Sequence, residues 1–482
     1  MPPYSLPLWL PIIGGHTLDA PVLRMGSWME SQIEKLGSDI EFYMLGFRVV
    51  TVSRLEDITR MLNSRPTKFI KPRQAKKTFE ELGVDPWLFT EEGRSWGKVR
   101  RLTAPSFSQA NVEMMLPDVV TMAEQVMGHV DGLVEKRKPV EVVDIYNKAA
   151  LSVVSIVGMG HDMHLFEPEK ADLESYAQIR NVFNMIFCRF FDLKKRITWY
   201  LPFQSWVTTY KRRDAVFNKM VDGLVADVKE ANKKGIENTS GRGLLLRKLV
   251  AASAASGKEG GLSDEQIRTN IKGYFVAGTD TTSRLMSFLT YSLASDPARQ
   301  ARVQKEIDDV LGGRPYPETY EDYSSLVYLQ ACVKEALRLR GPAHRIQLCS
   351  LVDWTMKDGR EYPAETYFSV LISACMRKEE NFSRAHEYIP ERWIDEEREA
   401  LLGADCAHNE RCFLSFGGGP RLCPGMGLAM MEAAVFVGSL FKNYDISMPK
   451  GHPEVNFVED ITTGIAELTV ETRGRRGHAP SK

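Results

Sequence analysis

The residues with the clearest chemical potential lie in a glycine-rich loop that presents one cysteine and then enters an apolar helical pattern, residues 413–433. Three consecutive glycines, 417–419, allow backbone conformations and close approaches that side chains would block. Cys423 comes just before the predicted helix, whose positive N-terminal end favours a thiolate over a thiol. A lone thiolate flanked by backbone amides suits the axial position of a haem iron, where it pushes electron density towards bound oxygen. Arg421 is close enough in sequence to reach a haem propionate.

Two other interpretations of this loop stay open on the residues alone. Most single cysteines are small buried hydrophobes, and a Gly-Pro turn around Cys423 is compatible with that role. A glycine-rich phosphate loop is the second alternative. It lacks support because no GxxxxGK(S/T) follows and no GxGxxG comes after a strand.

The loop matches the pattern F-x-x-G-x-R-x-C-x-G at every fixed position, which are Phe416, Gly419, Arg421, Cys423 and Gly425. It resembles the cysteine loop of the cytochromes P-450, the haem-thiolate monooxygenases, and the sequence is similar to the eukaryotic microsomal type. The resemblance implies that Cys423 is the axial ligand of the iron of haem b, and that Phe416 and Arg421 contact the haem. It also implies O2 as co-substrate and NADPH as electron source through a reductase.

Two further segments imply a charge cluster behind the loop. Glu335 and Arg338 are three residues apart in a helical segment, so they share one helix face. Such a pair is usually a weak surface ion pair. This segment, however, resembles the family's E-x-x-R helix, and Pro390-Glu391-Arg392-Trp393 resembles its P-E-R-F/W segment. The resemblance implies that Arg392 joins Glu335 and Arg338 in a buried, structural cluster that seats the haem loop.

The predicted helix 264–295 contains a stretch of poor helix formers, Gly273–Ser283. The Thr281 hydroxyl can bond to the carbonyl of Ala277, which loosens or bends a helix; a simple kink, or a break between two helices, is the alternative interpretation. The stretch resembles the family's oxygen-activating groove. The resemblance implies that Ala277 contacts the haem, that Thr281 holds a water or donates to bound oxygen, and that Asp280 links that water to solvent.

Trp96 and Arg100 lie four residues apart, so both can point at one haem propionate. Taken alone, such a pair is more often ordinary packing, but the segment resembles the family's W-x-x-x-R helix. The chain also departs from the family in two places. Arg345 comes earlier than the usual propionate-binding arginine, and Arg377 replaces a frequent histidine, so no propionate role is assigned to Arg345.

We expect a mainly α fold with small β-sheets, the cytochrome P-450 fold, in which the haem lies between a long kinked helix and the cysteine loop. Residues 1–482 are expected to form a single domain, with 1–15 as a proline-rich linker and 473–482 as a flexible tail. The Gly-, Ser-, Ala- and Lys-rich stretch 233–261 is expected to include a mobile surface connection. Hydrophobic periodicity predicts strands at 40–45 and 49–52, strand-like pieces within 345–373, and helices at 110–136, 141–158, 172–190, 206–233, 264–295 and 298–311.

Composition excludes several classes of protein. The 62 basic and 63 acidic residues nearly cancel, so no nucleic-acid partner is expected. None of the seven cysteines forms a CxxC pair, which argues against a zinc ribbon or a disulfide framework. The chain has no apolar run long enough for a transmembrane helix. The family resemblance implies the cytosolic face of the endoplasmic reticulum membrane, with peripheral membrane contact and an N-terminal anchor missing from this chain.

The expected activity is insertion of one oxygen atom of O2 into a small apolar substrate, such as a lipid, sterol, terpenoid or xenobiotic. No flavin or nicotinamide fingerprint occurs, so electrons are expected from NADPH–cytochrome P-450 reductase or a ferredoxin-type partner. A haem-thiolate isomerase or peroxygenase, and a non-catalytic haem binder, are the alternatives. Candidate substrate-pocket segments are 79–89, 182–205 and 461–465.

Overall fold

The computed structural model describes residues 24–37, 39–44, 47–191, 195, 198–201, 203–235, 241–254, 261–451, 455–459 and 461–475. The chain separates into two compact units, each assembled from stretches that are far apart in sequence. Unit 1 comprises residues 1–78, 335–423 and 457–464, and unit 2 comprises residues 79–334, 424–456 and 465–482. The expected linker at 1–15 lies outside the described residues, and the expected single domain stays a prediction.

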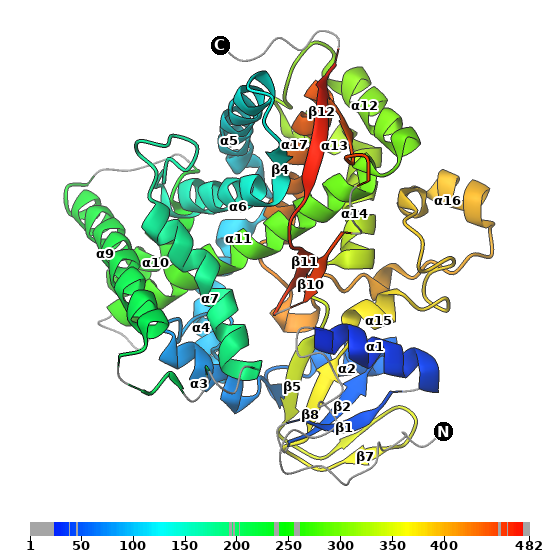
Figure 1. The fold of residues 1–482 in the computed structure, drawn as a ribbon. Helices are drawn as coiled ribbons and strands as arrows, with labels where there is room; N and C mark the ends of the chain where they lie inside the picture. The colour runs from blue at the N-terminus through cyan, green and yellow to red at the C-terminus, as the bar shows by residue number, and fades with distance from the viewer. Residues whose placement is uncertain are drawn as a thin grey trace. The chain divides into compact units, whose positions relative to one another are not determined.

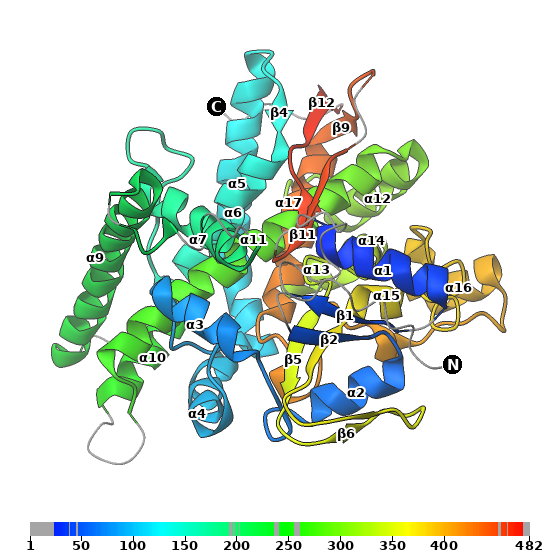
Figure 2. The same cartoon turned by 60° about the horizontal axis from the view of Figure 1, so that its bottom comes forward.

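Unit 1 contains a five-stranded sheet with the order β1-β2-β8-β5-β3. β2 and β8 are parallel, whereas the other neighbours are antiparallel. Strands β1, β2 and β5 of this sheet are labelled in Figure 2. The register pairs Val50 with Phe368, and both side chains are fully buried. The sheet strands are β1 (Glu41–Met44), β2 (Phe47–Val52), β3 (Phe69–Ile70), β5 (Ile346–Ser350) and β8 (Tyr367–Val370), and the two-stranded ribbons are β6 (Trp354–Thr355) with β7 (Glu361–Tyr362) and β10 (Phe457–Glu459) with β11 (Thr463–Ile465).

Short helices cover this sheet and enclose its apolar core. One buried cluster joins the sheet to α2 through Ile58 and Met61, and a second joins α1 to β1 through Met29 and Phe42. Two helices, α3 (Arg73–Glu81) and α14 (Val327–Arg340), begin in one unit and end in the other along the chain. The remaining helices of unit 1 are α1 (Met25–Leu36), α2 (Leu55–Asn63), α15 (Ile372–Met376), η5 (Pro390–Trp393), α16 (Asp395–Leu402), η6 (Glu410–Cys412) and η7 (Gly419–Arg421).

Unit 2 is mainly helical, and its long helix α11 packs along α6 (Figure 1). A capping box at Ser263 starts α11, because its hydroxyl accepts from Gln266 N and the Gln266 side chain returns the contact. A three-stranded sheet has the order β4-β12-β9. The elements are α4 (Gly93–Thr103), η3 (Ala104–Phe107), α5 (Gln109–Glu135), β4 (Val140–Glu141), α6 (Val142–Val153), η4 (Val154–Gly158), α7 (Leu173–Phe191), α9 (Ser205–Lys233), α10 (Leu244–Ala254), α11 (Asp264–Ala294), α12 (Pro297–Leu311), α13 (Tyr320–Ser325), α17 (Met426–Asn443), β9 (Tyr444–Ser447) and β12 (Thr469–Gly474).

The predicted mainly α fold with small sheets is confirmed, and each predicted long helix is present within a few residues of its expected ends. Three details differ. The helix expected at 141–158 is α6 followed by a π-helical turn at Val154–Gly158. The stretch expected as a connection contains α10, which forms because Leu245, Leu246 and Leu249 are buried. Arg473 and Gly474, expected in the flexible tail, end strand β12.

In the described part of the chain, every helix is too short or too polar to cross a bilayer.

Candidate functional site

The loop that carries Cys423 lies in unit 1 and is held by its own backbone. Cys423 N donates to Phe416 O at 3.0 Å, which closes the loop, and Leu422 N donates to Gly419 O at 3.1 Å. Gly419 has a φ of 62°, and a Cβ at this position would lie 2.6 Å from Leu62 O of α2. Only glycine therefore permits this approach. The side chains of Phe416 and Cys423 are half-buried, and Arg421, also half-buried, ends η7.

The start of the same loop is attached to α14 and α15. Ser415 Oγ donates to Leu337 O at 2.9 Å. The sulfur of Met376 accepts from Leu414 N and Ser415 Oγ, each at 3.4 Å. These contacts are made within unit 1, so the loop leading to Cys423 begins on fixed elements.

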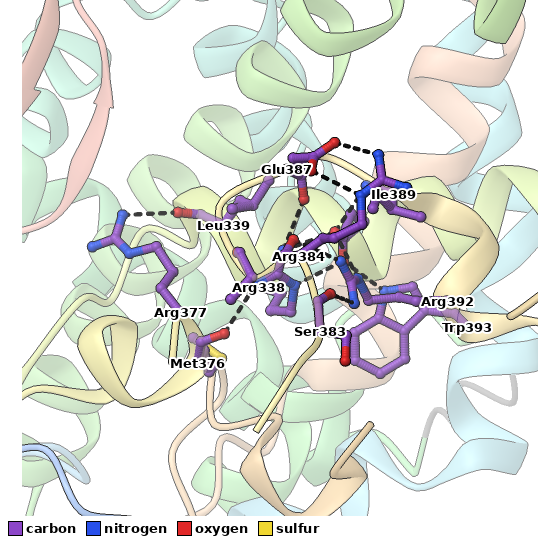
Figure 3. Close-up of polar contacts among 12 residues, drawn as sticks. Arg338, Leu339, Met376, Arg377, Ser383, Arg384, Glu387, Ile389, Arg392 and Trp393 are labelled. Carbon is purple, nitrogen blue, oxygen red and sulfur yellow. Dashed lines mark hydrogen bonds and ion pairs between the residues drawn. The ribbon is translucent and has the colours of Figure 1, made fainter. Parts of the chain in front are cut away.

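Glu335, Arg338 and Arg392 form a fully buried cluster in unit 1. Figure 3 labels the two arginines of this cluster together with Trp393. Arg338 binds both oxygens of Glu335, through Nη2 at 2.8 Å and Nε at 2.9 Å. Arg392 Nε donates to Oε1 of the same carboxylate at 3.0 Å. The Trp393 indole donates to Oε2 at 3.0 Å, and Ile389 N donates to Oε1 at 2.9 Å. One carboxylate thus receives five hydrogen bonds out of contact with water.

Further guanidinium N–H groups of this cluster donate to backbone carbonyls. Arg338 donates to the carbonyls of Met376, Ala385 and Glu387. Arg392 donates to two further carbonyls, those of Ser383 at 2.9 Å and Arg384 at 3.2 Å. Burial lowers the pKa of Arg392, while Glu335 acts in the opposite direction. Because the carbonyls belong to residues 376–387, the cluster fixes this segment beside α14.

In unit 2, the run of hydroxyl residues in α11 bonds to its own helix. Thr281 Oγ1 donates to Ala277 O at 2.7 Å, as the spacing predicts. Thr279 Oγ1 donates to Phe275 O at 2.6 Å in the same way. Helix α11 is unbroken through this stretch, so the alternative of two helices is wrong. The widened turn over Ala277 stays a prediction.

Asp280 is paired with a basic residue one turn further along α11. Arg284 Nε donates to Asp280 Oδ2 at 2.9 Å, and 22% of the Asp280 side chain remains exposed. Ser283 Oγ donates to Asp280 O at 3.1 Å and to Asn147 Oδ1 of α6 at 3.0 Å. Thr282, by contrast, is almost fully buried. The acid and the hydroxyl expected to move protons, Asp280 and Thr281, are thus neighbours that are both half-buried, whereas Thr282 is closed to water.

Trp96 and Arg100 are both half-buried on α4, one helical turn apart, in unit 2. Among the described residues, Arg100 makes no ion pair with a carboxylate. A half-buried guanidinium of this kind suits an anionic group that the chain itself does not supply, such as a propionate. The predicted site residues fall into two groups: those of unit 1 are Phe416, Arg421, Cys423, Glu335, Arg338 and Arg392, and those of unit 2 are Trp96, Arg100, Ala277, Asp280 and Thr281.

The two departures noted in the sequence have local partners in unit 1. Arg345 lies 3.5 Å from Glu459 Oε1, and His344 Nε2 lies 3.4 Å from the same oxygen. Arg377 pairs with Glu30 of α1. Arg345 is almost buried in its contact with Glu459, so its position is explained by an ion pair within the protein.

Glu459 also binds the first turn of α1. Its carboxylate accepts from Gly26 N and Ser27 N, and from Ser27 Oγ at 2.7 Å. Burial alone would raise the pKa of Glu459, but the contacts with His344, Arg345 and the Ser27 N–H outweigh it and lower the pKa to about 2. The carboxylate therefore ties α1 to the β10 strand.

Sequence reasoning missed three contributors to these clusters. Trp393 belongs to the P-E-R-F/W segment, but its hydrogen bond to Glu335 was not predicted. Arg284 was missed, although its spacing from Asp280 fits an ion pair across one helical turn. Glu459 has no local pattern that indicates its role, because its partners are 114 or more positions away in sequence.

Comparisons with known proteins agree with these observations. A family model described as Cytochrome P450 matches residues 2–470. Cytochrome P450 4d2 of Drosophila melanogaster is 27% identical over 399 residues, 78% of this chain and 76% of the relative. Cytochrome P450 3A14 of Cavia porcellus is 26% identical over 357 residues, 73% of this chain and 68% of the relative.

A third relative is named both as a cytochrome P450 and as an NADPH–P450 reductase. The bifunctional cytochrome P450/NADPH–P450 reductase of Fusarium oxysporum is 25% identical over 431 residues, 87% of this chain and 39% of the relative. The family model covers nearly the whole chain, so the chain belongs to the cytochrome P450 family. The members of this family are haem-thiolate monooxygenases.

Proposed function

We propose that this chain inserts one oxygen atom of O2 into a small apolar substrate, with Cys423 as the axial ligand of haem b and electrons supplied from NADPH by a separate reductase. The observation that carries this proposal is the closed Cys423 loop, in which a half-buried cysteine is held by a backbone hydrogen bond to Phe416. When bound, the haem supplies the binding and activation of O2. The protein residues position the reactants and handle the protons.

The residues present fit a haem with two propionates. Cys423 supplies a single sulfur ligand beside a glycine-lined turn. Arg100, without a carboxylate partner among the described residues, and Trp96 on the same helix would hold one propionate. Arg421 would hold a propionate from the loop side. Phe416 and, on α11, Ala277 would add apolar contacts to the macrocycle.

Thr281 and Asp280 are the proposed catalytic residues. The Thr281 hydroxyl is already ordered by Ala277 O, and its oxygen can accept from a water at the same time. Asp280 keeps part of its carboxylate exposed while Arg284 holds its orientation. Protons would therefore pass from solvent to Asp280 and then, through a water held by Thr281, into the proposed substrate pocket.

The substrate side of the proposed pocket is formed by aromatic residues docked on α11. Phe79, Trp87 and Phe89 form one cluster, with ring centroids 5.5–6.5 Å apart. The Trp87 ring lies directly on Gly273, where a Cβ would come within 1.8 Å of it. Leu88 N donates to Asn270 Oδ1 at 2.9 Å, which fixes the same segment. This surface favours a lipid, sterol, terpenoid or xenobiotic. Much of the candidate segment 182–205 lies outside the residues whose side chains are described.

The family and a group of exposed apolar residues support the proposed partners and location. The reductase fused to one relative supports NADPH as the electron source, with a ferredoxin-type protein as the alternative donor. Tyr200, Leu201 and Phe203 are exposed, Phe203 by 96%. Three such neighbours favour peripheral contact with a membrane, which we place at the cytosolic face of the endoplasmic reticulum. The near-zero net charge gives nucleic acid no electrostatic attraction.

The decisive experiment combines a spectrum with a reconstituted assay. The reduced protein should give a thiolate-type spectrum with carbon monoxide, and Cys423→Ser should lose it because a serine hydroxyl stays neutral and ligates iron weakly. An unchanged spectrum in this variant contradicts the assignment of Cys423.

The reconstituted assay distinguishes the three functions. Apolar compounds that displace water from the haem would be tested for oxidised products with NADPH and a P450 reductase. Product that requires the reductase supports the proposal. Product formed without reductase, or from peroxide alone, favours the isomerase or peroxygenase. Failure of every bound compound to react favours a non-catalytic haem binder.

A further inference from the structure

Two cysteines outside the proposed haem site face each other in the core of unit 1. Cys375 lies near the end of α15 and Cys412 ends η6. Both are fully buried, and their sulfur atoms are 3.3 Å apart. A disulfide bond is about 2.05 Å long, so the two atoms need to approach by only about 1.3 Å.

The surroundings give the two sulfurs different roles. Asn381 Nδ2 donates to Cys375 O at 2.9 Å and also faces Cys375 Sγ at 3.7 Å. Cys412 Sγ faces the same Cys375 carbonyl at 3.5 Å. Because an N–H group faces the Cys375 sulfur, we assign the first attack on peroxide to Cys375. The hydrogen bond with Cys375, together with burial, raises the pKa of Cys412.

We propose that Cys375 and Cys412 form a reversible disulfide bond when the protein meets hydrogen peroxide. The Cys375 sulfur attacks the peroxide O–O bond, which gives a sulfenic acid at Cys375 and releases one water. The Cys412 sulfur then attacks this sulfenic sulfur, forms the S–S bond and releases the second water. Two thiols lose two electrons and two protons in total, and one peroxide is reduced to two waters. A dithiol reductant reverses the reaction by thiol–disulfide exchange.

The disulfide bond would reinforce the joint formed by the contacts of Met376, which already supports the Cys423 loop. Met376 is adjacent to Cys375. Its carbonyl accepts a hydrogen bond from Arg338, and its sulfur accepts from Leu414 N and Ser415 Oγ. The disulfide would add a covalent link at this joint, between residues 37 positions apart in sequence. Because it constrains the unfolded chain, oxidation should raise the apparent thermal midpoint by about 5 °C. This inference does not depend on the proposed monooxygenase activity.

The test is peptide mapping of the full-length protein after treatment with excess hydrogen peroxide. Free thiols are alkylated under denaturing conditions, and the protein is digested without reduction. We expect one cross-linked pair of peptides, carrying Cys375 and Cys412, and two fewer alkylated thiols than in untreated protein. The rise in the thermal midpoint and the cross-link should both disappear after dithiothreitol.

Matched variants identify the pair. Cys375→Ala and Cys412→Ala should each abolish the cross-link and the midpoint rise, whereas Cys349→Ala, also buried in unit 1, should retain both. If an alanine variant fails to fold, the map of the unmodified protein decides alone. The proposal is overturned if peroxide leaves both thiols free, or oxidises them only to unlinked acids. It is also overturned if the cross-link joins another cysteine or leaves the midpoint unchanged.

Discussion

Two acids of this chain, Glu335 and Asp280, show opposite ways of using a carboxylate. Glu335 is fully buried and receives hydrogen bonds from two arginines, an indole and a backbone N–H. Asp280 is held by Arg284 but keeps 22% of its side chain exposed. A carboxylate saturated with donors fixes the groups around it, whereas a partly hydrated one can still bond to water. The first arrangement suits structure, and the second suits proton transfer.

The largest effect should come from neutralising the saturated acid. Glu335→Gln keeps the size of the side chain but leaves Arg338 and Arg392 buried without a counter-charge. We expect a loss of about 3–5 kcal/mol in the free energy of unfolding, with little soluble, haem-containing protein. Urea unfolding and haem content measure this. Glu396→Gln, on the exposed face of α16, is the control and should behave like the parent protein. A stable Glu335→Gln protein with full haem content would contradict the structural role.

The second prediction concerns the partly hydrated acid and its neighbour. Thr281→Ala should spare folding, haem binding and reductant consumption, but product per reductant should fall about a hundredfold, with hydrogen peroxide rising in proportion. Asp280→Asn should lower the rate of product formation for the same reason. Thr282→Ala is the control, because Thr282 lies at a different angle on α11 and is almost fully buried. If Thr281→Ala retains coupling, proton delivery must use other residues.

A third acid, Glu459, contributes to the stability of the fold in a way that depends on pH. Its pKa is lowered from the ordinary value of 4.5 to about 2 in the folded protein. The ionised carboxylate therefore stabilises the fold fully at pH values above 4.5. This contribution is lost as pH falls from 4.5 towards 2. Between pH 5 and 3 we expect it to account for about 2 kcal/mol of lost stability. In Glu459→Gln the acid-dependent loss, followed by urea unfolding, should be smaller by that amount. Equal losses in both proteins would contradict the assignment.

The parts of the molecule that could be predicted from sequence depend on local spacing. The Thr281–Ala277 hydrogen bond and the shared face of Glu335 and Arg338 follow from helical periodicity, and both are present. Long apolar periodicity likewise located α11 within one residue of its observed end. These features need no knowledge of distant residues.

The features that sequence analysis missed depend on contacts between distant segments. Helix α10 contains leucines, which favour helix formation, but Gly, Ser and Lys flank it in the sequence. Burial of these leucines within unit 2 stabilises the helix. Arg345 meets Glu459 across 114 positions of sequence, so no local pattern indicated the pair. The indole of Trp393 reaches Glu335 across 58 positions. Tertiary packing, rather than propensity, decides each of these cases.

The smallest predicted effect tests whether each donor to Glu335 contributes separately. Trp393→Phe removes one hydrogen bond, at 3.0 Å, to a buried carboxylate. The phenyl ring can keep the edge contacts that Trp393 makes with His408 and Phe413. We expect a loss of about 1.5 kcal/mol, because a hydrogen bond to a charged group is removed while the ion pairs with Arg338 and Arg392 remain.

A second tryptophan of unit 1 provides the matched control for this change. Trp354 is buried, whereas Trp393 is half-buried; Trp354 packs edge-on against Phe69, but its indole Nε1 finds no acceptor among the described residues. Trp354→Phe therefore removes similar apolar volume without removing a hydrogen bond. The difference between the two variants in urea unfolding isolates the bond to Glu335. If both variants lose the same stability, the indole adds only packing, and the saturation of Glu335 rests on its two arginines and one backbone N–H.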